Sequence, residues 1–166
     1  MALLVLVGLP GTGKTSVAQR VAQILGRPFI DTDEALSSAV GCAASDFLRA
    51  AGEGEFREKE RLALEQSLGA DAVIATGGGV VTTKASRDLL AGERTLWLDC
   101  DDEVILARVA DGDRPLLGDE PRASLARLRS EREQWYRQVS RVRVDASGTL
   151  EDVVARVLSE LEEAER

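Results

Sequence analysis

The stretch Gly8-Leu9-Pro10-Gly11-Thr12-Gly13-Lys14-Thr15 decides how this chain folds. It matches the pattern G-x-x-x-x-G-K-[ST], a glycine-rich loop whose backbone N–H groups surround the phosphates of a nucleotide. An apolar run, Leu3-Leu4-Val5-Leu6-Val7, precedes it, as expected of a parallel strand that is covered on both faces. Apolar residues at helical spacing follow it until Gly26, where a helix commonly ends. The sequence therefore predicts a P-loop between a buried strand and a helix N-terminus, which favours an anion.

The loop also predicts which groups contact the nucleotide. Lys14 is expected to reach the β- and γ-phosphate oxygens, and the Thr15 hydroxyl is expected to ligate Mg²⁺. The alternative, a glycine-rich turn with a chance lysine, is disfavoured because the chain has only three lysines and both flanking elements fit. The loop residues predicted to bind the nucleotide are Gly11, Thr12, Gly13, Lys14, Thr15 and Ser16.

Composition and charge narrow the classes of function. A length of 166 residues suits one domain, over 1–166, and the net charge of -8 argues against nucleic acid or an anionic membrane as partner. Because the chain has no histidine, a general base has to be a carboxylate, and the commonest transition-metal ligand is missing. Cys42 and Cys100 lack zinc-like spacing and, without a signal or membrane-spanning pattern, predict free thiols in a cytoplasmic protein.

Two acidic residues follow the second expected strand. Asp31 and Asp33 come directly after Phe29-Ile30, so they are predicted at the carboxyl edge of the sheet, where ligands bind in open α/β folds. Their spacing of two places both on one side of an extended segment. One is expected near Mg²⁺ and the other near a second substrate. An Asp-rich turn that caps the next helix remains an alternative for either acid.

A run of three glycines marks the end of the third expected strand. Gly77-Gly78-Gly79 follow the apolar residues 72–75, which indicates that the backbone itself approaches another group closely, although a plain flexible turn is an alternative. Arg57 stands in a charged run near the start of a helix. On the residues alone it is predicted to be a surface arginine.

The rest of the chain predicts alternating helices and strands. The expected elements are two short helices within 34–52 that break at Gly41, a helix over 53–68, one ending at Leu90, a strand over 95–98, a helix from 103, a helix over 122–139, a strand over 141–144 and a terminal helix. Helix caps are expected at Ser45 or Asp46, at Thr82 or Thr83, and at Thr149 with Asp152. Two prolines and a glycine within 114–121 predict a mobile loop.

Taken together, these motifs resemble the shikimate kinase family, small P-loop kinases of the pathway to chorismate and the aromatic amino acids. The resemblance covers nearly the whole chain. It implies an α/β fold with three α/β/α layers, a parallel five-stranded sheet in the order 2-3-1-4-5, a shikimate-binding region at about 33–61 and a mobile lid at about 112–122. The motifs that carry it are the P-loop, Asp31-Thr32-Asp33, Glu55-Phe56-Arg57, Gly77-Gly78-Gly79, and Arg114-Pro115-Leu116 with Arg132 and Tyr136.

The resemblance also implies a reaction, the phosphorylation of the shikimate 3-hydroxyl by ATP with Mg²⁺. Asp33 would hold the ring hydroxyls and assist deprotonation, as a catalytic residue beside Lys14 and Arg114, and Asp31 would support Mg²⁺ beside Thr15. Arg114 would contact the phosphates from the lid. Arg108 would lie near adenine, together with the turn after Asp145. The residues implied to bind the shikimate carboxylate are Arg57, Arg132 and the backbone of Gly78 and Gly79. Gly77 is also expected among the residues that bind the substrate.

Some positions depart from the family pattern. Ala44 and Leu48 stand where relatives carry a bulky aliphatic and an aromatic residue, which leaves Phe56 as the bulky wall, and Ser37 stands where an acid is common. Two other readings remain: a gluconate-type carbohydrate kinase, and a catalytically silent kinase-like regulatory protein that binds nucleotide. The expected partners are ATP and shikimate, without nucleic acid or membrane, and a monomer is expected.

Overall fold

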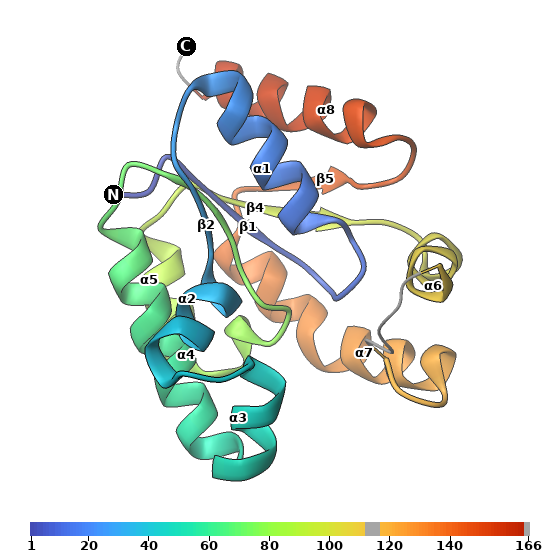
Figure 1. Ribbon diagram of the computed structural model, residues 1–166. Coiled ribbons are helices and arrows are strands. Elements are labelled where there is room, and N and C mark those ends of the chain that lie inside the picture. The colour runs from blue at the N-terminus through green and yellow to red at the C-terminus, as the bar shows by residue number, and fades with distance from the viewer. Residues whose placement is uncertain (112–116, 165–166) are drawn as a thin grey trace.

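The computed structural model describes residues 1–111 and 117–164 and contains one parallel sheet (Figure 1). Its strands have the spatial order β2-β3-β1-β4-β5, so the predicted order is confirmed. Because all neighbouring strands are parallel, their carboxyl ends meet at one edge. The strands are β1 (Leu4–Val7), β2 (Phe29–Asp31), β3 (Val73–Ala75), β4 (Thr95–Asp99) and β5 (Val142–Asp145).

Helices cover both faces of the sheet. Figure 1 shows α1 and α8 side by side on one face, with α5 and α7 on the other. Helices α2 and α3 pack on α4, and α6 lies beside α7. The helices are α1 (Lys14–Leu25), α2 (Thr32–Val40), α3 (Ala44–Ala51), α4 (Glu53–Leu68), the 3₁₀ turn η1 (Val80–Thr82), α5 (Lys84–Ala91), α6 (Asp102–Ala110), α7 (Pro121–Val139) and α8 (Leu150–Glu163).

Most of the predicted helix ends are confirmed. Gly26 ends α1 with a left-handed backbone at φ 62, and its N–H donates to carbonyls of the last turn. Thr83 caps α5, and Thr149 forms a capping box with Asp152 at the start of α8. Helices α6 and α7 each begin one residue earlier than expected, and β5 runs one residue later.

The expected cap of α3 is wrong. Neither Ser45 nor Asp46 caps this helix, because both lie inside its first turn after the N-cap Ala43. The first free N–H of the helix, that of Ala44, instead donates to the Ser37 hydroxyl at 3.1 Å. A side chain of the preceding helix therefore accepts the hydrogen bond that a local cap would accept. A pattern of residues at the start of α3 cannot predict such a contact.

The core follows from the buried strands. Strands β1, β3 and β4 are buried throughout, and they pack with the apolar faces of α1, α5, α7 and α8. A smaller cluster of Leu36, Phe56 and Ala63 holds α2 to α4, with Ala44 packed at its margin. Cys42 is exposed and Cys100 is buried, and both are free thiols. No helix among the described residues is long and apolar enough to cross a membrane.

Candidate active site

The end of β2 places Asp31 against the P-loop. Its Oδ1 caps α2 by accepting from the N–H groups of Asp33 and Glu34, at 2.9 and 3.4 Å. Its Oδ2 accepts from the Thr15 hydroxyl at 2.9 Å. The capping alternative and the expected position beside Thr15 therefore hold at once, because the two oxygens of one carboxylate serve different partners.

Lys14 lies folded onto its own loop. Its ammonium donates to the carbonyls of Gly8 and Leu9 at 2.8 and 2.9 Å, and the residue is only 8% exposed. Burial lowers the pKa of Lys14 to about 8, although the nearby carboxylates of Asp33 and Asp31 favour its charged form. A cation held this close to the mouth of the loop is placed to bind phosphate oxygens.

Asp33 lies on the first turn of α2 and faces the glycine run. A Cβ placed on Gly77 would come within 2.7 Å of Asp33 Oδ1, so the carboxylate lies directly over that glycine. Burial raises the pKa of the Asp33 carboxyl, and the charge of Asp31 adds to the rise, whereas Lys14 and Arg57 oppose it. A carboxylate with a raised pKa is suited to accept a proton near neutral pH.

Each glycine of the run has a different close neighbour. A Cβ on Gly78 would meet Pro10 of the P-loop at 3.0 Å, and one on Gly79 would meet the Arg57 guanidinium at 2.5 Å. The close approach of the backbone, predicted from the three glycines, is therefore present on both sides of the run. It draws the P-loop, α2 and α4 together around the end of β3.

Arg57 is not the surface residue that the charged run predicts. Its side chain is 15% exposed, and its Nη1 donates to the Gly79 carbonyl at 3.2 Å and to the Glu60 carboxylate at 2.8 Å. Glu60 is 3% exposed, and burial raises the pKa of its carboxyl, while Arg57 opposes the rise. The surface prediction was wrong because the face of α4 that carries Arg57 and Glu60 turns toward the sheet edge.

Helix α7 contributes Arg132 and Tyr136 to the same region. The Tyr136 hydroxyl donates to the Gly78 carbonyl. Arg132 lies close enough to Tyr136, Glu60 and Lys14 to affect the pKa of each. The Arg132 Nε is buried and has no hydrogen-bond partner among the described residues. This unpaired donor is available to an anion.

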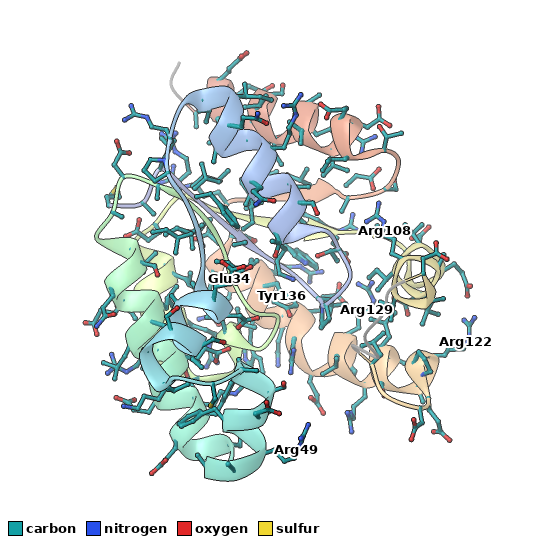
Figure 2. The ribbon with its side chains drawn as sticks, viewed as in Figure 1. Glu34, Arg49, Arg108, Arg122, Arg129 and Tyr136 are labelled. Carbon is teal, nitrogen blue, oxygen red and sulfur yellow. The ribbon has the colours of Figure 1, made fainter. Side chains whose placement is uncertain are left out.

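Arg108 joins the P-loop to the turn after β5. Its guanidinium donates to the carbonyls of Ala146, Gly148 and Thr12, at 2.6, 3.3 and 3.3 Å. Figure 2 shows Arg108, a residue of the last turn of α6, apart from the central position of Tyr136. The two ends of the site are thus distinct, with Arg108 at one side of the P-loop and the glycine run at the other. Arg114 and the other residues of 112–116, the first part of the expected lid, lie outside the described residues.

A cavity of about 380 Å³ runs between the P-loop and the glycine run. It brings together the expected P-loop residues except Thr12, both acids and two of the three glycines. The Thr12 side chain is buried and its hydroxyl donates to the Leu9 carbonyl. Arg57, Arg132 and Arg108 do not line this cavity itself. Its lining residues are Pro10, Gly11, Gly13, Lys14, Thr15, Ser16, Asp31, Asp33, Thr76, Gly77 and Gly78.

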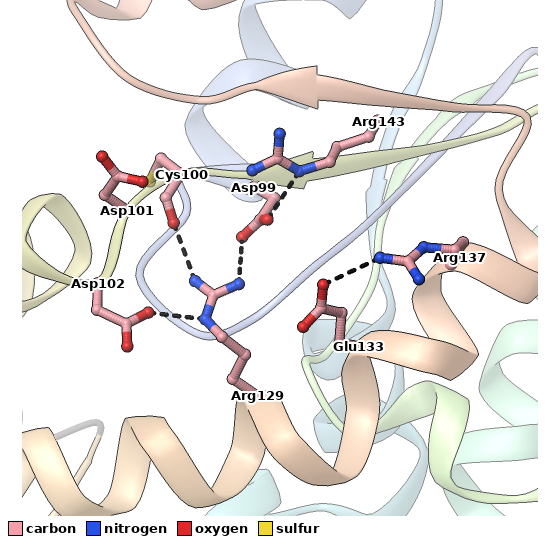
Figure 3. A pocket seen from close by; sticks show the side chains of 8 residues that line it. All are labelled: Asp99, Cys100, Asp101, Asp102, Arg129, Glu133, Arg137 and Arg143. Atoms are coloured by element: carbon pink, nitrogen blue, oxygen red, sulfur yellow. Dashed lines mark hydrogen bonds and ion pairs between the residues drawn. The ribbon is translucent and has the colours of Figure 1, made fainter.

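A second hollow, of about 460 Å³, lies at the end of β4 (Figure 3). All three of its arginines are paired with acidic side chains that also line it. Arg129 of α7 donates to Asp99, Asp102 and the Cys100 carbonyl, and Arg143 of β5 donates to Asp99. This network fastens α7 to the sheet and to α6, and it leaves the charge of the 2% exposed Asp99 compensated by two arginines.

The residues expected to hold Mg²⁺ fit a hard cation. The Thr15 hydroxyl oxygen and Asp31 Oδ2 are 2.9 Å apart, and both can serve as oxygen ligands. Within 1–111 and 117–164, no group of three or more acidic, cysteine or histidine side chains could hold a metal. Mg²⁺ is commonly bound by one or two protein oxygens together with water and substrate phosphates, and this pair suits that arrangement.

Comparison with known proteins identifies the family. The family model described as shikimate kinase matches residues 10–162. This chain belongs to the shikimate kinase family. It is 36% identical to the shikimate kinase of Corynebacterium jeikeium (strain K411) over 162 residues, which cover 96% of this chain and 88% of that relative. That match covers nearly the full length of both chains, and this chain is an enzyme of the family.

Solved structures agree with the family assignment. The shikimate kinase of Acinetobacter baumannii in complex with shikimate superposes with a TM-score of 0.89 at 31% identity, covering 97% of this chain and 93% of that one. A gluconokinase from Sinorhizobium meliloti 1021 superposes with a TM-score of 0.65 at 19% identity, covering 97% and 91%. The second likeness shows a shared fold alone.

Two residues of this site had no role in the prediction from sequence. Glu60, which pairs with Arg57, lies within a run of charges that has the composition of a solvated helix face. Tyr136 formed part of a motif without a stated function. The residue type itself could have indicated a role. The single tyrosine of the chain stands on the apolar stripe of a helix, and a buried tyrosine hydroxyl needs a hydrogen-bond partner.

Proposed function

We propose that this protein transfers the γ-phosphoryl group of ATP to the 3-hydroxyl of shikimate. One observation carries the substrate assignment: at the carboxyl end of β3, Asp33 lies over the first glycine of the run and Arg57 against the last. A carboxylate for hydroxyls at one end and a guanidinium for an anion at the other suit a small ring that bears both groups. The cavity between that glycine run and the P-loop joins the two substrates.

The shikimate carboxylate would be held by two arginines and the glycine backbone. Arg57 already lies against Gly79 and can offer its remaining N–H groups, and the unpaired Nε of Arg132 offers a buried donor. Guanidinium groups bind carboxylates through parallel hydrogen bonds, which fix orientation as well as charge. Gluconate, the substrate of the carbohydrate kinase alternative, also bears a carboxylate, so the match to the shikimate kinase family, and not this arrangement, favours shikimate.

Asp33 would act as the base for the attacking hydroxyl. The proton of the 3-hydroxyl passes to an Asp33 carboxylate oxygen, the hydroxyl oxygen forms a bond to the γ-phosphorus, and the bond from that phosphorus to the β-phosphate bridging oxygen breaks to leave ADP. Lys14 would move from its loop carbonyls to the phosphates, and Arg114 would stabilise the charge of the transferring group. Mg²⁺, held by Thr15 and Asp31 together with ATP, would neutralise phosphate charge.

Steady-state release of ADP tests this proposal. With ATP and Mg²⁺ present, ADP should form in multiple turnovers on addition of shikimate, and much more slowly on addition of gluconate. Isothermal titration with each acid, with and without a non-hydrolysable ATP analogue, measures binding separately from turnover. Faster turnover of gluconate would support the carbohydrate kinase instead, and binding of nucleotide without turnover of either acid would support a silent regulatory protein.

A further inference from the structure

Tyr136 is buried at the centre of the molecule, and its hydroxyl contacts the Gly78 carbonyl and lies within hydrogen-bonding reach of Arg132. The side chain is completely buried, and its hydroxyl donates to the Gly78 carbonyl. The ring stacks on Trp97 of β4, with centroids 6.0 Å apart and planes 25° apart. The Arg143 guanidinium lies over the Trp97 ring at 5.6 Å. The stack on Trp97 of β4 therefore holds the Tyr136 ring from outside the glycine run, and Arg143 of β5 contacts Trp97 in turn.

The peptide that Tyr136 holds is the one between Gly78 and Gly79. A trans peptide is planar, and its C=O and N–H point in opposite directions, so a carbonyl directed at Tyr136 directs the Gly79 N–H away from it. Glycine on both sides of this peptide lets it rotate more freely than any other pair. The hydrogen bond from Tyr136 thus restrains the rotation of this peptide, which the glycines themselves cannot do because they have no side chains.

Two of the three N–H groups of this run, those of Gly78 and Gly79, remain available among the described residues. Within the described part of the chain, the N–H of Gly77 donates to the Thr32 hydroxyl at 3.3 Å, whereas those of Gly78 and Gly79 donate to no protein acceptor. Arg57 contacts the same segment through the Gly79 carbonyl. An anion held by Arg57 would therefore lie close to an unused backbone donor whose direction depends on Tyr136.

We propose that Tyr136 is a positioning residue for shikimate: by holding the Gly78 carbonyl, it directs the Gly79 N–H toward the shikimate carboxylate. The inference rests on the proposed function and adds a residue that does not touch the substrate. Burial raises the pKa of Tyr136 to about 12, so the hydroxyl remains a donor throughout the pH range of an ordinary assay. The restraint acts on substrate binding, and ATP is bound by other residues.

Substitution Tyr136→Phe tests this role because it removes the hydroxyl and keeps the ring against Trp97. We expect the shikimate KM and Kd to rise roughly tenfold, as for the loss of one well-oriented hydrogen bond, with the ATP KM within about twofold of wild type. Thr95→Val is a matched control, since it also removes a buried hydroxyl that donates to a carbonyl, that of Leu90 at 3.2 Å. The control should lower Tm without changing either KM.

Several outcomes overturn the inference. A Tyr136→Phe enzyme with wild-type shikimate affinity, or one that loses ATP and shikimate affinity in parallel, would leave Tyr136 with a packing role only. Wild-type protein that does not phosphorylate shikimate would overturn the proposed function and this inference with it. If the variant does not fold, ¹⁵N spectra of the wild-type protein provide the test. On titration with shikimate, the resonance of the Gly79 amide should shift and that of the Gly54 amide of α4 should not. An unmoved Gly79 amide would refute the role.

Discussion

The Asp33 carboxylate occupies the space that a side chain at position 77 would need, since a Cβ on Gly77 would lie 2.7 Å from its Oδ1. Substitution Gly77→Ala should displace the carboxylate and lower kcat at least about tenfold, because a base loses effect when it moves by an ångström. Steady-state kinetics measure this, with the ATP KM expected to stay close to wild type. Gly54→Ala is the control, because that glycine faces open space on α4 and alanine there should raise stability by about 0.5–1 kcal/mol. A Gly77→Ala enzyme as active as the control would show that Asp33 is free to sit elsewhere.

Asp33→Asn should lower kcat by at least about 100-fold while the fold and ATP affinity change little. The pH profile gives a second test. Because burial raises the pKa of Asp33, wild-type kcat/KM should fall as pH drops through that raised pKa, where the base becomes protonated and inactive. The residual activity of the asparagine variant should lack this acid limb. An unchanged limb would assign it to another group.

ATP affinity should depend on pH through Lys14. With a pKa of about 8 in the free enzyme, Lys14 loses its positive charge as pH rises through that value, whereas an ordinary lysine keeps it until about 10.4. The ATP Kd should therefore increase between about pH 7.5 and 9, as measured by isothermal titration. Shikimate binding over the same range is the internal control, since it uses arginines. A constant ATP Kd would mean that Lys14 stays charged.

Asp31 has two functions that two variants separate. Asn caps helices about as well as Asp, so Asp31→Asn should leave the free energy of unfolding nearly unchanged and raise the Mg²⁺ concentration needed for half-maximal activity. Asp31→Ala should show the same metal effect and also lose about 1 kcal/mol of stability with the cap. Denaturant unfolding and Mg²⁺ titration give the two readouts. An Asp31→Asn enzyme with a normal Mg²⁺ requirement would reduce this residue to a helix cap.

Arg132 and Arg114 should differ in which kinetic constant they affect. In the proposed function Arg132 binds the shikimate carboxylate before the chemical step, so Arg132→Ala should raise the shikimate KM strongly. Arg114→Ala should lower kcat by on the order of 10³, about 4 kcal/mol of transition-state stabilisation, with shikimate binding nearly unchanged. Steady-state kinetics of the two variants decide between these roles. A normal kcat for Arg114→Ala would make it an ordinary loop arginine.

Local patterns predicted the elements of the fold well, because the strands that matter are buried on both faces and the helix ends carry strong signals. The buried β1, the left-handed Gly26 and the capping box at Thr149 each depend on neighbours in sequence. The strand order came from resemblance to a family, since periodicity alone does not distinguish one parallel order from another. Neither the local patterns nor the family resemblance predicted that the Ser37 hydroxyl accepts a hydrogen bond from the first N–H of α3.

The site was predictable where a residue type has one main use, and less so where tertiary packing decides. A lysine in a P-loop and a run of glycines at a strand end each occur in few structural settings, so the sequence alone indicates what surrounds them. Arg57 and Glu60 do not, since their sequence context is that of an exposed helix face and only the packing of α4 against the sheet edge buries them. The Tyr136 contact joins residues 58 positions apart and depends on the placement of α7.

The hydrogen bonds from Lys14 to the carbonyls of Gly8 and Leu9 hold its ammonium on acceptors within the P-loop itself. A phosphate has to compete with these two carbonyls, so the net affinity for a nucleotide is the difference between two sets of hydrogen bonds. The same carbonyls are ready to take the ammonium back when the phosphate leaves. The Gly8 and Leu9 carbonyls thus compete with the phosphates for the Lys14 ammonium. This competition lowers the affinity for ADP after the reaction and favours release of the product and repeated turnover.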